Sequence, residues 1–440
     1  MEQGVAARAS DAATSAPAHE WNSYTVYALG FLTLISAFNY LDRAVLGLAL
    51  PLIKRELLVS DTALGLASGL AFAVFYSLLG VPIAWLADRW NRRNVIAIGF
   101  AFWSLMTALT RFVADIWQLA AARFLMGAGE ACGIAPSNSM ISDLVREPRR
   151  PLALAMFGLA SSLAALLFYP LIGWVGQHYG WRGMFTASGA PGLVLAVLFF
   201  FTVKEPSRDV TQGRRTLPPP LSLPDSVRFL LGSRTYLLML IGSMFMGASV
   251  YAGSTWNAMY LTRVHHLPIA AVAASIGPLQ GICGGTGILL GGLLTDALGR
   301  RDARWLLGLP ATACLLAAPA EVLFLLGGGR VAWMIGFGLM SFFALAHQAP
   351  VFAAAMSTAR VGMRAVAISM LVLASGLLGQ IVGPLLVGVL NDRLHALLGD
   401  TAVRYSLLLV ALCLAGASLA FFAGINSFIK DRERARRPEA

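Results

Sequence analysis

Charged side chains are scarce in this sequence, whereas long apolar runs are abundant. Only 12% of the 440 residues are Asp, Glu, Lys or Arg, and 58% are hydrophobic. A soluble globular domain of average composition carries about twice that charged fraction, roughly 25%. We therefore predict a protein that crosses a membrane several times rather than a soluble one.

Lysine and cysteine are also rare, and each scarcity excludes a class of protein. The chain has only Lys54, Lys204 and Lys430, and no G-x-x-x-x-G-K-[ST] stretch that would hold nucleotide phosphates. An ATP-driven pump of that kind is therefore excluded, and any transport must use an ion gradient or run downhill. The four cysteines lie far apart within apolar runs, without a C-x-x-C pair, which indicates neither a disulfide framework nor a zinc site. We expect no metal and no cofactor.

The apolar residues form runs of the length that a membrane requires. A helix needs about 20 residues to cross ~30 Å of hydrocarbon. We predict an all-α membrane protein with twelve transmembrane helices, preceded by a polar tail that is retained rather than cleaved as a signal. The predicted spans cover residues 25–50, 62–86, 94–113, 117–142, 152–175, 185–203, 235–261, 269–294, 304–326, 331–356, 363–390 and 404–429.

The net charge of +11 is concentrated in alternate loops. The basic stretches "DRWNRRN", "DLVREPRRP", "GRRDAR", "ARVGMR" and "KDRERARR" and the segment 204–234 all fall on one side of the predicted spans. Basic loops favour the cytoplasmic side of a membrane. We therefore expect a multi-pass protein of the cell (inner) membrane with both termini in the cytoplasm, and no nucleic-acid partner.

The two halves of the chain resemble each other. "AWLADRWNRR" at 84–93 and "GLLTDALGRR" at 292–301 align aspartate with aspartate and twin arginine with twin arginine. Such repeats in membrane proteins indicate two pseudo-symmetric bundles that rock about a shared site. The predicted domains are a cytoplasmic tail at 1–24, a six-helix bundle at 25–203, a proline-rich cytoplasmic linker at 204–234, a second six-helix bundle at 235–429 and a basic cytoplasmic tail at 430–440.

The matched loops resemble the signature G-x-L-x-D-x-x-G-R-[KR] of the major facilitator superfamily. The second copy has both glycines, and the first has Ala84 and Asn91 in their places. The resemblance implies the major facilitator fold and a cytoplasmic gate, in which an aspartate near a helix end pairs with arginine of the neighbouring bundle. The residues expected in this gate are Asp88, Arg89, Arg92, Arg93, Asp296, Arg300 and Arg301.

A closer resemblance is to the Spinster branch of that superfamily. It rests on "FNYLDR", "DRWNRR", "AFWSL", "RFLMGAGEA", "IAPSNSMISDL" and "VKEPSR", all in the N-terminal half. Spinster proteins are implicated in moving lysophospholipids and sphingosine-1-phosphate-like lipids, in several cases with protons. The resemblance implies such a role by alternating access. The alternative is an organic-anion:proton symporter of the same superfamily, for a sugar acid or other carboxylate, in which N-Y-x-D-R also begins the first span.

Four ionisable side chains interrupt the apolar runs: Asp42 and Arg43 in the first span, Arg123 and Glu130 in the fourth. An ion at the bilayer centre costs about 2.5–3.5 kcal/mol, so such groups occur mainly where they face a cavity and a partner. Arg123 and Glu130 share one helix face, whereas Asp42 and Arg43 diverge by about 100°. We predict that Asp42 and Glu130 exchange protons, and that Arg43, Arg123 and Asn39 form the network that binds an anionic head group. The alternative is a static network that joins the two spans.

The C-terminal half has no charges at the matching positions and supplies aromatic and amide side chains instead. One polar wall and one apolar wall suit an amphipathic ligand with a charged head and an acyl tail. We expect His347 to be a candidate for a proton relay, and Glu321 to reach the membrane interface. The side chains expected to line the pocket are Tyr40, Trp256, Asn257, Tyr260, Phe342, Phe343, His347 and Gln348.

An enzyme is the alternative from a different functional class. The stretch "HALLGD" at 395–400 has the H-x-x-x-x-D spacing of lipid acyltransferases, but it stands alone, without a nucleophile or a phosphate-binding motif. No enzymatic activity is predicted. The expected partners are a lipid-like or small anionic substrate, protons and the lipid bilayer, and we expect a monomer.

Overall fold

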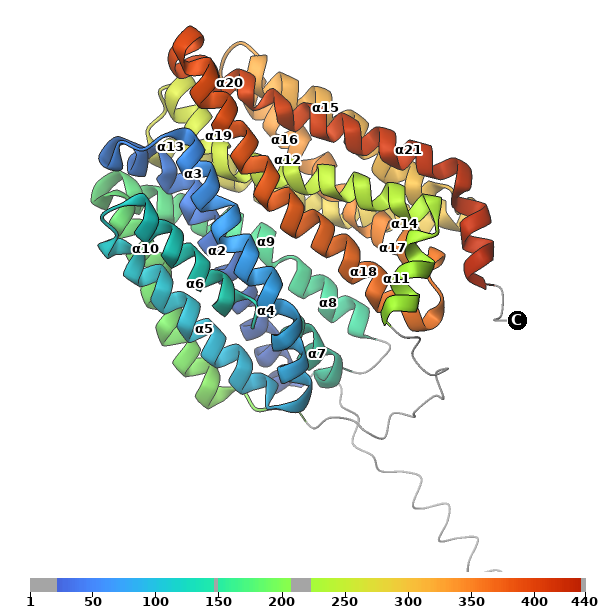
Figure 1. The fold of residues 1–440 in the computed structure, drawn as a ribbon. Coiled ribbons are helices and arrows are strands. Elements are labelled where there is room, and N and C mark those ends of the chain that lie inside the picture. Colours follow the sequence, from blue (N-terminus) through green and yellow to red (C-terminus); the bar gives the residue numbers. More distant parts are fainter. Residues whose placement is uncertain (1–21, 146–148, 207–222, 437–440) are drawn as a thin grey trace, which may run out of the picture.

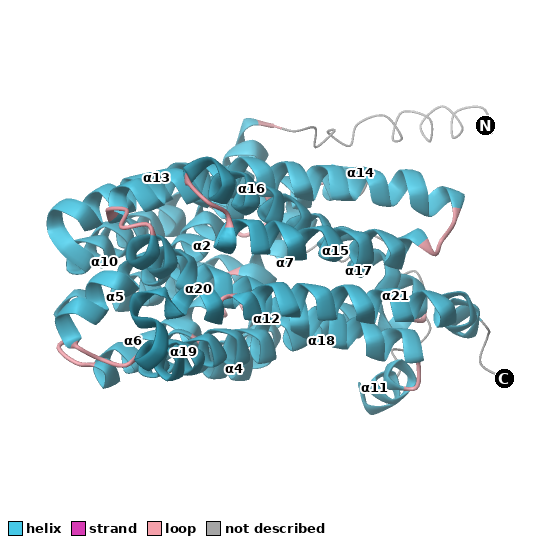
Figure 2. Ribbon diagram, turned by 90° about the horizontal axis from the view of Figure 1, so that it is seen from above, coloured by secondary structure: helices cyan, strands magenta, loops and turns pink. Residues whose placement is uncertain are grey.

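The computed structural model describes residues 22–145, 149–206 and 223–436, and the elements in these ranges are helices joined by short loops (Figure 2). Figure 1 shows two groups of helices side by side, with blue-to-green elements in one group and yellow-to-red elements in the other. The predicted all-α architecture is confirmed. Most of the predicted N-terminal tail lies outside the described residues.

The described part of the N-terminal half contains nine α-helices, the short 3₁₀-helix η1 (Thr110–Phe112) and one π-helical turn. The helices are α2 (Ser23–Leu57), α3 (Asp61–Ser68), α4 (Leu70–Arg89), α5 (Arg92–Leu109), α6 (Ile116–Glu130), α7 (Ile134–Leu144), α8 (Arg150–Gly158), α9 (Ala160–Leu163) and α10 (Tyr169–Thr202), with the π turn η3 (Ala164–Phe168) between α9 and α10.

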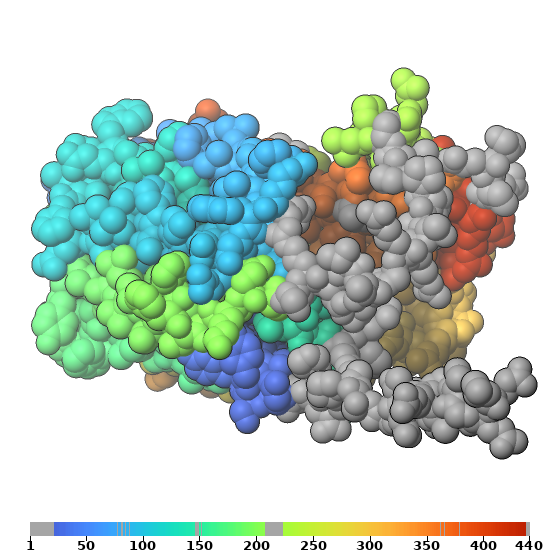
Figure 3. All heavy atoms as spheres, turned by 90° about the horizontal axis from the view of Figure 1, so that it is seen from below, coloured from blue at the N-terminus to red at the C-terminus, as the bar shows by residue number. Residues whose placement is uncertain are grey.

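The C-terminal half begins with a short helix in the predicted linker, α11 (Leu223–Leu231), which lies on this half (Figure 3). The other elements are α12 (Arg234–Val264), α13 (Ile269–Leu279), η4 (Gln280–Gly284), α14 (Gly285–Arg301), α15 (Trp305–Leu326), α16 (Arg330–Ala346), α17 (Gln348–Thr358), η5 (Val361–Met363), α18 (Arg364–Leu373), η6 (Ala374–Leu378), α19 (Gly379–Leu398), η7 (Gly399–Thr401), α20 (Ala402–Ser406) and α21 (Leu408–Arg436).

Nine segments of the described chain are long and apolar enough to cross a membrane. Two of them, Leu152–Thr202 and Val366–Arg436, have 51 and 71 residues, and each contains an internal break, at Gly180 and at Gly399–Thr401 respectively. The predicted fourth span is interrupted at residues 131–133, which divide it into α6 and α7, of 15 and 11 residues. These segments are consistent with the predicted twelve spans.

Short polar side chains cap the helices at the predicted starts of several spans. The side chains of Asn22, Ser60, Asn91, Asp115 and Ser233 each accept a hydrogen bond from the backbone N–H three residues later. Such caps satisfy one of the unpaired N–H groups of a helix start, and each contributes about 1 kcal/mol. The helix boundaries therefore follow directly from local sequence.

The internal repeat extends to the irregularities of the helices. π-Helical turns begin at Ala164 in the fifth span and at Ala374 in the eleventh, which are equivalent positions of the two halves. A third lies at Gln280–Gly284 in the eighth span. π turns rotate the residues that follow them relative to a regular α-helix and occur often at functional sites. Here η3 of one half contacts η4 of the other.

The halves pack against each other through α2 with α12, α3 with α19, and α10 with α13. Glycines allow this close approach. A Cβ atom built on Gly47 of α2 would lie 2.2 Å from the backbone oxygen of Ser254, and one on Gly65 of α3 would lie 2.5 Å from that of Pro384. No side chain fits at such distances, so each contact between the halves depends on glycine.

Charged residues join the two halves at one end of these contacts. The loop charges predict that this end is extracytoplasmic, and we call it the outer end. Asp61, at the start of α3, receives two hydrogen bonds from Arg263 of α12, at 2.7 and 2.9 Å, and one from Lys54. Asp392 of α19 accepts from the backbone N–H groups of Asp61 and Thr62, at 3.0 and 2.8 Å. The carboxylate of one half thus caps a helix of the other, and Figure 1 shows α3 beside α19.

Helices nearer the inner end stay with their own half. α8 packs mainly on α2, α7 and α9, and α18 mainly on η6, α17 and α12. Among the described helices, the main contacts between the halves are therefore at the outer end.

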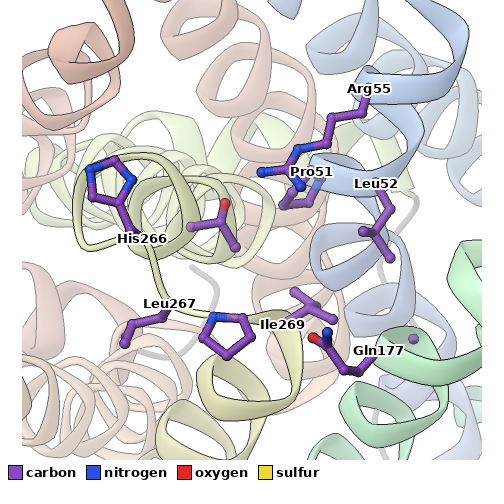
Figure 4. Close-up of a pocket in the computed structure, with 10 residues that line it drawn as sticks. Pro51, Leu52, Arg55, Gln177, His266, Leu267 and Ile269 are labelled. Atoms are coloured by element: carbon purple, nitrogen blue, oxygen red, sulfur yellow. The ribbon is translucent and has the colours of Figure 1, made fainter.

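A cavity of about 310 Å³ lies at the outer end between the halves (Figure 4). The end of α2, part of α10 and the loop from α12 to α13 line it, and Arg55 extends from α2 toward the loop that carries His266. None of the four predicted central charges lines this cavity. It is distinct from the site described next.

Candidate functional site

Glu130 is fully buried at the end of α6 and joins the first and fourth spans. Its Oε2 accepts hydrogen bonds from Asn39 Nδ2 at 3.0 Å and from Arg43 Nε at 2.9 Å. Asn39 and Arg43 are one turn apart on α2, so the first span presents both donors to one carboxylate oxygen. The other oxygen, Oε1, is buried and has no hydrogen-bond partner in the described part of the chain.

Arg43 faces the space between the halves and lies among aromatic rings. Its Cζ atom is 4.9 Å from the ring centroids of both Phe72 and Tyr76 of α4. Tyr40 and Tyr251 also lie close enough to interact electrostatically with it, and Tyr251 belongs to α12 of the other half. The side chain is 19% exposed, the largest exposure in the charge network, and its Nη2 has no partner among the described residues. An aromatic surround stabilises a cation by roughly 0.5–2 kcal/mol while leaving its donors available.

Asp42 faces the other way. It is 1% exposed and lies beside the hydroxyl groups of Thr107 on α5 and Ser188 on α10, inside the N-terminal bundle. Its backbone oxygen is 3.5 Å from Nη1 of Arg123, which is itself 2% exposed and has its Cζ 5.0 Å from the Phe72 ring. The divergence expected of adjacent helical residues is present: Arg43 faces the space between the halves, and Asp42 faces the core of one half.

The four charges balance, but their hydrogen bonding is incomplete. Within the described residues, one atom of each central side chain is buried without a partner: Asn39 Oδ1, Asp42 Oδ1, Arg43 Nη2, Arg123 Nε and Glu130 Oε1. A static network should satisfy its buried polar atoms, because each unsatisfied one costs about 1–3 kcal/mol. The arrangement can instead take up protons at the carboxyl groups and an anion at the free edge of Arg43.

The structure places two of the predicted pocket residues in the packing of the C-terminal half. Trp256 is fully buried, and its Nε1 donates to the backbone oxygen of Pro384 at 3.0 Å. Tyr260 is also fully buried, and its hydroxyl lies 3.1 Å and 2.8 Å from the backbone oxygens of Phe324 and Leu325. Both side chains hold helices of the C-terminal half together, and that they also line the pocket stays a prediction.

The other predicted pocket residues are spread over the two halves. Tyr40 is 36% exposed, and Asn257 is buried with its Oδ1 unpartnered in the described structure. Phe342 and Phe343 are half-buried and meet edge to face, with ring centroids 5.2 Å apart. His347 lies at the break between α16 and α17 with its Nδ1 against the Ala344 oxygen, and the adjacent Gln348 is exposed. In the described part of the chain, the hydrogen-bond partners of Glu130 are Asn39 and Arg43, and none of these C-terminal side chains is among them.

The residues predicted to form the cytoplasmic gate differ between the two halves. The arginines of the first half contact neighbouring side chains, whereas the described charged residues of the second half are exposed. Arg92 is 3% exposed and forms ion pairs with Asp143 at 2.5 Å and Glu205 at 2.7 Å, all within the N-terminal half. The backbone N–H of Arg93 donates to Glu205 at 2.8 Å, and Arg89 lies over the Trp85 ring. In the C-terminal half, Asp296, Arg300 and Arg301 are exposed and show no ion pair within the described residues. The side chain of Asp88 lies outside what the structure describes.

The pairing of these arginines across the bundles is thus absent from the described part of the structure. Arg92 instead joins α5, α7 and the residues that follow α10.

Replacing Arg92 by glutamine should destabilise the N-terminal bundle, because Asp143 and Glu205 would lose their shared cation and repel each other. We expect the free energy of unfolding to fall by about 1–3 kcal/mol. Thermal unfolding of the purified protein in detergent measures this. Arg93→Gln is the matched control: its side chain pairs with Asn94 and the Phe200 ring rather than with a carboxylate, so its melting temperature should stay closer to that of the wild type.

Glu321 differs from its expected position. It is fully buried, so the prediction that it reaches the membrane interface is wrong. α15 is packed between α16 and α21, and its neighbour α20 covers one end, which leaves no path for this side chain to extend to the surface.

Three aromatic residues around Arg43 were not anticipated from the sequence: Phe72, Tyr76 and Tyr251. The first two occur in an apolar run, where aromatic residues carry no specific signal. Tyr251 could have been predicted from the internal repeat, because the spacing between the matched aspartates Asp88 and Asp296, applied to Arg43, leads to Tyr251. The repeat thus places an arginine of one half opposite a tyrosine of the other.

Comparisons of this chain with protein families and with individual known proteins agree on one family. The family model described as the Major Facilitator Superfamily matches residues 32–384. An MFS-type efflux pump of Mycolicibacterium smegmatis is 31% identical over 396 residues, covering 89% of this chain and 90% of the relative. The sphingosine-1-phosphate transporter SPNS2 of Danio rerio is 26% identical over 441 residues, covering 93% and 85%. The probable galactarate/D-glucarate transporter GudP of Bacillus subtilis is 28% identical over 312 residues, covering 66% and 68%.

Among solved structures, a bacterial homologue of the human lysosomal transporter Spinster, in an inward-facing and unoccupied conformation, superposes with a TM-score of 0.81. Its sequence is 24% identical, and the alignment covers 93% of this chain and 98% of that one. The likeness shows the same fold, and the conformation named for that structure agrees with the outer closure seen here.

Proposed function

The chain belongs to the Major Facilitator Superfamily and is a multi-pass membrane transporter rather than an enzyme, and on that premise we propose that it is a proton-coupled carrier of an amphipathic anionic lipid. The lipid class proposed is a lysophospholipid or a sphingosine-phosphate-like molecule. We further propose that it resides in the inner membrane with both termini in the cytoplasm, and that it works as a monomer.

One observation carries the proton coupling: Arg43 is shared between Glu130 and the space between the halves. While Glu130 is ionised it holds Arg43 by a 2.9 Å ion pair. A proton on Glu130 removes that attraction and leaves Arg43 free for an anionic head group, and a bound anion in turn favours the proton on Glu130. Proton and anion therefore bind with positive linkage, which is the property that a coupled transporter needs.

The difference between the charged N-terminal side and the apolar C-terminal side of the site supports a lipid as the substrate. The charges of the site all come from the N-terminal half, whereas α16 of the C-terminal half contributes the half-buried rings of Phe342 and Phe343. A head group at Arg43 and an apolar chain toward α16 would match this division. The similarity to SPNS2, which covers nearly the whole chain, agrees with it.

The second candidate is a sugar-acid:proton symporter. The similarity to GudP favours it, because a dicarboxylate sugar would also pair with Arg43 and compete with Glu130. The same charge network could bind either substrate. The two candidate functions therefore differ in the substrate and share the proton coupling.

The test is transport by the purified protein in liposomes with an imposed pH gradient. A labelled lysophosphatidic acid and labelled glucarate are measured in parallel, with protein-free liposomes as the control for passive lipid transfer. We expect the lysolipid to move faster when the gradient is present and glucarate to remain at background. Movement of glucarate alone would establish the second candidate, and movement of neither would contradict both substrate classes.

A further inference from the structure

A second buried acid lies in the other bundle, away from the Glu130 network. Glu321 of α15 is fully buried, and neither of its carboxylate oxygens has a hydrogen-bond partner within the described residues. An ionised carboxylate without partners in an apolar interior costs many kcal/mol. This side chain is therefore accommodated in the present arrangement only as a neutral, protonated carboxyl group.

One polar side chain of another element, Tyr260, interacts with Glu321, and two further polar side chains interact with Tyr260. Tyr260 of α12 interacts electrostatically with both Glu321 and Arg404 of α20, and the tyrosine hydroxyl contacts the last backbone carbonyls of α15. His265, in the loop after α12, has its Nε2 2.9 Å from the same hydroxyl. The hydroxyl donates to the carbonyls, so the Nε2–H of His265 donates to the hydroxyl.

From Tyr260, these contacts lead through His265 to the outer surface. His265 is half-buried and the adjacent His266 is exposed at the mouth of the outer cavity. Burial, together with nearby Arg404 and His266, holds the pKa of His265 below its usual range, so it is neutral near pH 7. A neutral imidazole beside a phenol can pass a proton in either direction.

No other charge is placed to neutralise Glu321. Among the elements packed against α15, α17 carries no ionisable residue, and α16 has only Arg330, exposed at its start. The charged residues of α14 and α21 lie at their opposite, inner ends, and Cys413 of α21 is buried and uncharged. Among the described residues, Arg404 is the cation that shares Tyr260 with Glu321, and its Nε is buried without a partner.

The N-terminal half shows what a static pair at a comparable place looks like. There Arg182, near the start of the sixth span, binds Glu56 and also donates to the Val113 oxygen at 3.1 Å. Trp181 donates to the other oxygen of Glu56 at 2.7 Å. That carboxylate is partly exposed and fully partnered, whereas Glu321 is buried and has no partner.

We propose that Glu321 is a second proton-binding site, filled and released from the outer side through Tyr260 and His265, with Arg404 as the cation that receives its carboxylate when the proton leaves. The site adds a proton to the one proposed at the Glu130 network. It rests on the structure of the C-terminal half alone and needs no assumption about the transported substrate.

The experiment is infrared spectroscopy of the purified wild-type protein, which detects the C=O stretch of protonated carboxyl groups, as the pH is raised from 5 to 9. We expect part of this band to persist above pH 7 in the wild type and to be missing in Glu321→Gln. Glu56→Gln is the matched control and should leave the band unchanged, because Glu56 is already ionised and paired.

A second variant keeps Glu321 in place. Arg404→Gln removes the cation that would receive the carboxylate, so the band should persist to higher pH than in the wild type. An unchanged band in both Glu321→Gln and Arg404→Gln would overturn the proposal. Because neither measurement uses a substrate, failure of lysolipid transport would refute the proposed function and leave this result standing.

Discussion

With glutamine in place of Glu130, the protein should still exchange substrate across a liposome membrane but no longer accumulate it when a pH gradient is imposed. Glutamine keeps the length of the side chain and an oxygen for Arg43 and Asn39, but it cannot bind or release a proton near neutral pH. We expect gradient-driven accumulation to fall by about 10-fold or more, a factor that corresponds to at least 1.4 kcal/mol of lost coupling.

Counterflow of labelled against unlabelled substrate, without a gradient, is the matched measurement on the same liposomes. Arg43 loses its carboxylate partner in this variant, so substrate should bind at least as well as in the wild type. Asn39→Ala removes the other donor to Glu130 without removing the proton site, and it should keep gradient-driven accumulation. Equal accumulation by Glu130→Gln and the wild type would show that the pair only joins the two spans.

The second large effect is expected from tryptophan at Gly47. Even a Cβ atom there would lie 2.2 Å from the Ser254 oxygen, so an indole ring cannot fit between α2 and α12 while the outer end is closed. The variant should therefore populate the outward-open arrangement and transport at background rates. Reversing a conformational ratio from 1:99 to 99:1 takes about 5.5 kcal/mol. Inserting a few extra methylene groups into packed structure already costs about 1–3 kcal/mol, and an indole ring against backbone atoms is a much larger insertion.

Spin labels measure the expected movement directly. Leu58 at the end of α2 and Leu397 of α19 are 86% and 83% exposed and lie on opposite halves at the outer end, so cysteines there can be labelled after the four native cysteines are replaced. The distance between the labels should increase in Gly47→Trp. Gly30→Trp, on the same helix but with nothing within 4 Å of its Cβ, should keep the wild-type distance and transport. An unchanged distance in Gly47→Trp would contradict the assignment of this contact to outer closure.

The sequence was sufficient for the features that depend on composition along the chain. Runs of apolar residues and the caps before them define where spans begin, and the repeated aspartate and arginines reveal two halves. The central acids and bases could also be identified, because any charge in an apolar run is conspicuous. That Asp42 and Arg43 face different neighbours follows from helical geometry alone.

What the sequence could not provide is the rotation of each helix about its axis and the order in which helices surround one another. Glu321 lies five residues before the end of α15, a position from which a carboxylate on a lipid-facing helix would extend to the interface. Only the packing of α16, α20 and α21 around α15 shows that this path is closed. Likewise, Trp256 and Tyr260 are polar-tipped aromatics on an inner-bundle span, and their hydrogen bonds to backbone oxygens of α15 and α19 appear only in three dimensions.

The junction at the outer end consists of Lys54, Asp61, Arg263 and Asp392 together with backbone N–H groups, rather than of apolar side chains. Because the Asp61 side chain is only 3% exposed, ions of the external medium screen these contacts much less than they would screen ion pairs at the surface. The burial of the junction thus insulates the closed arrangement from the salt content of the surroundings, and the resting position of the carrier should vary little between fresh and saline media.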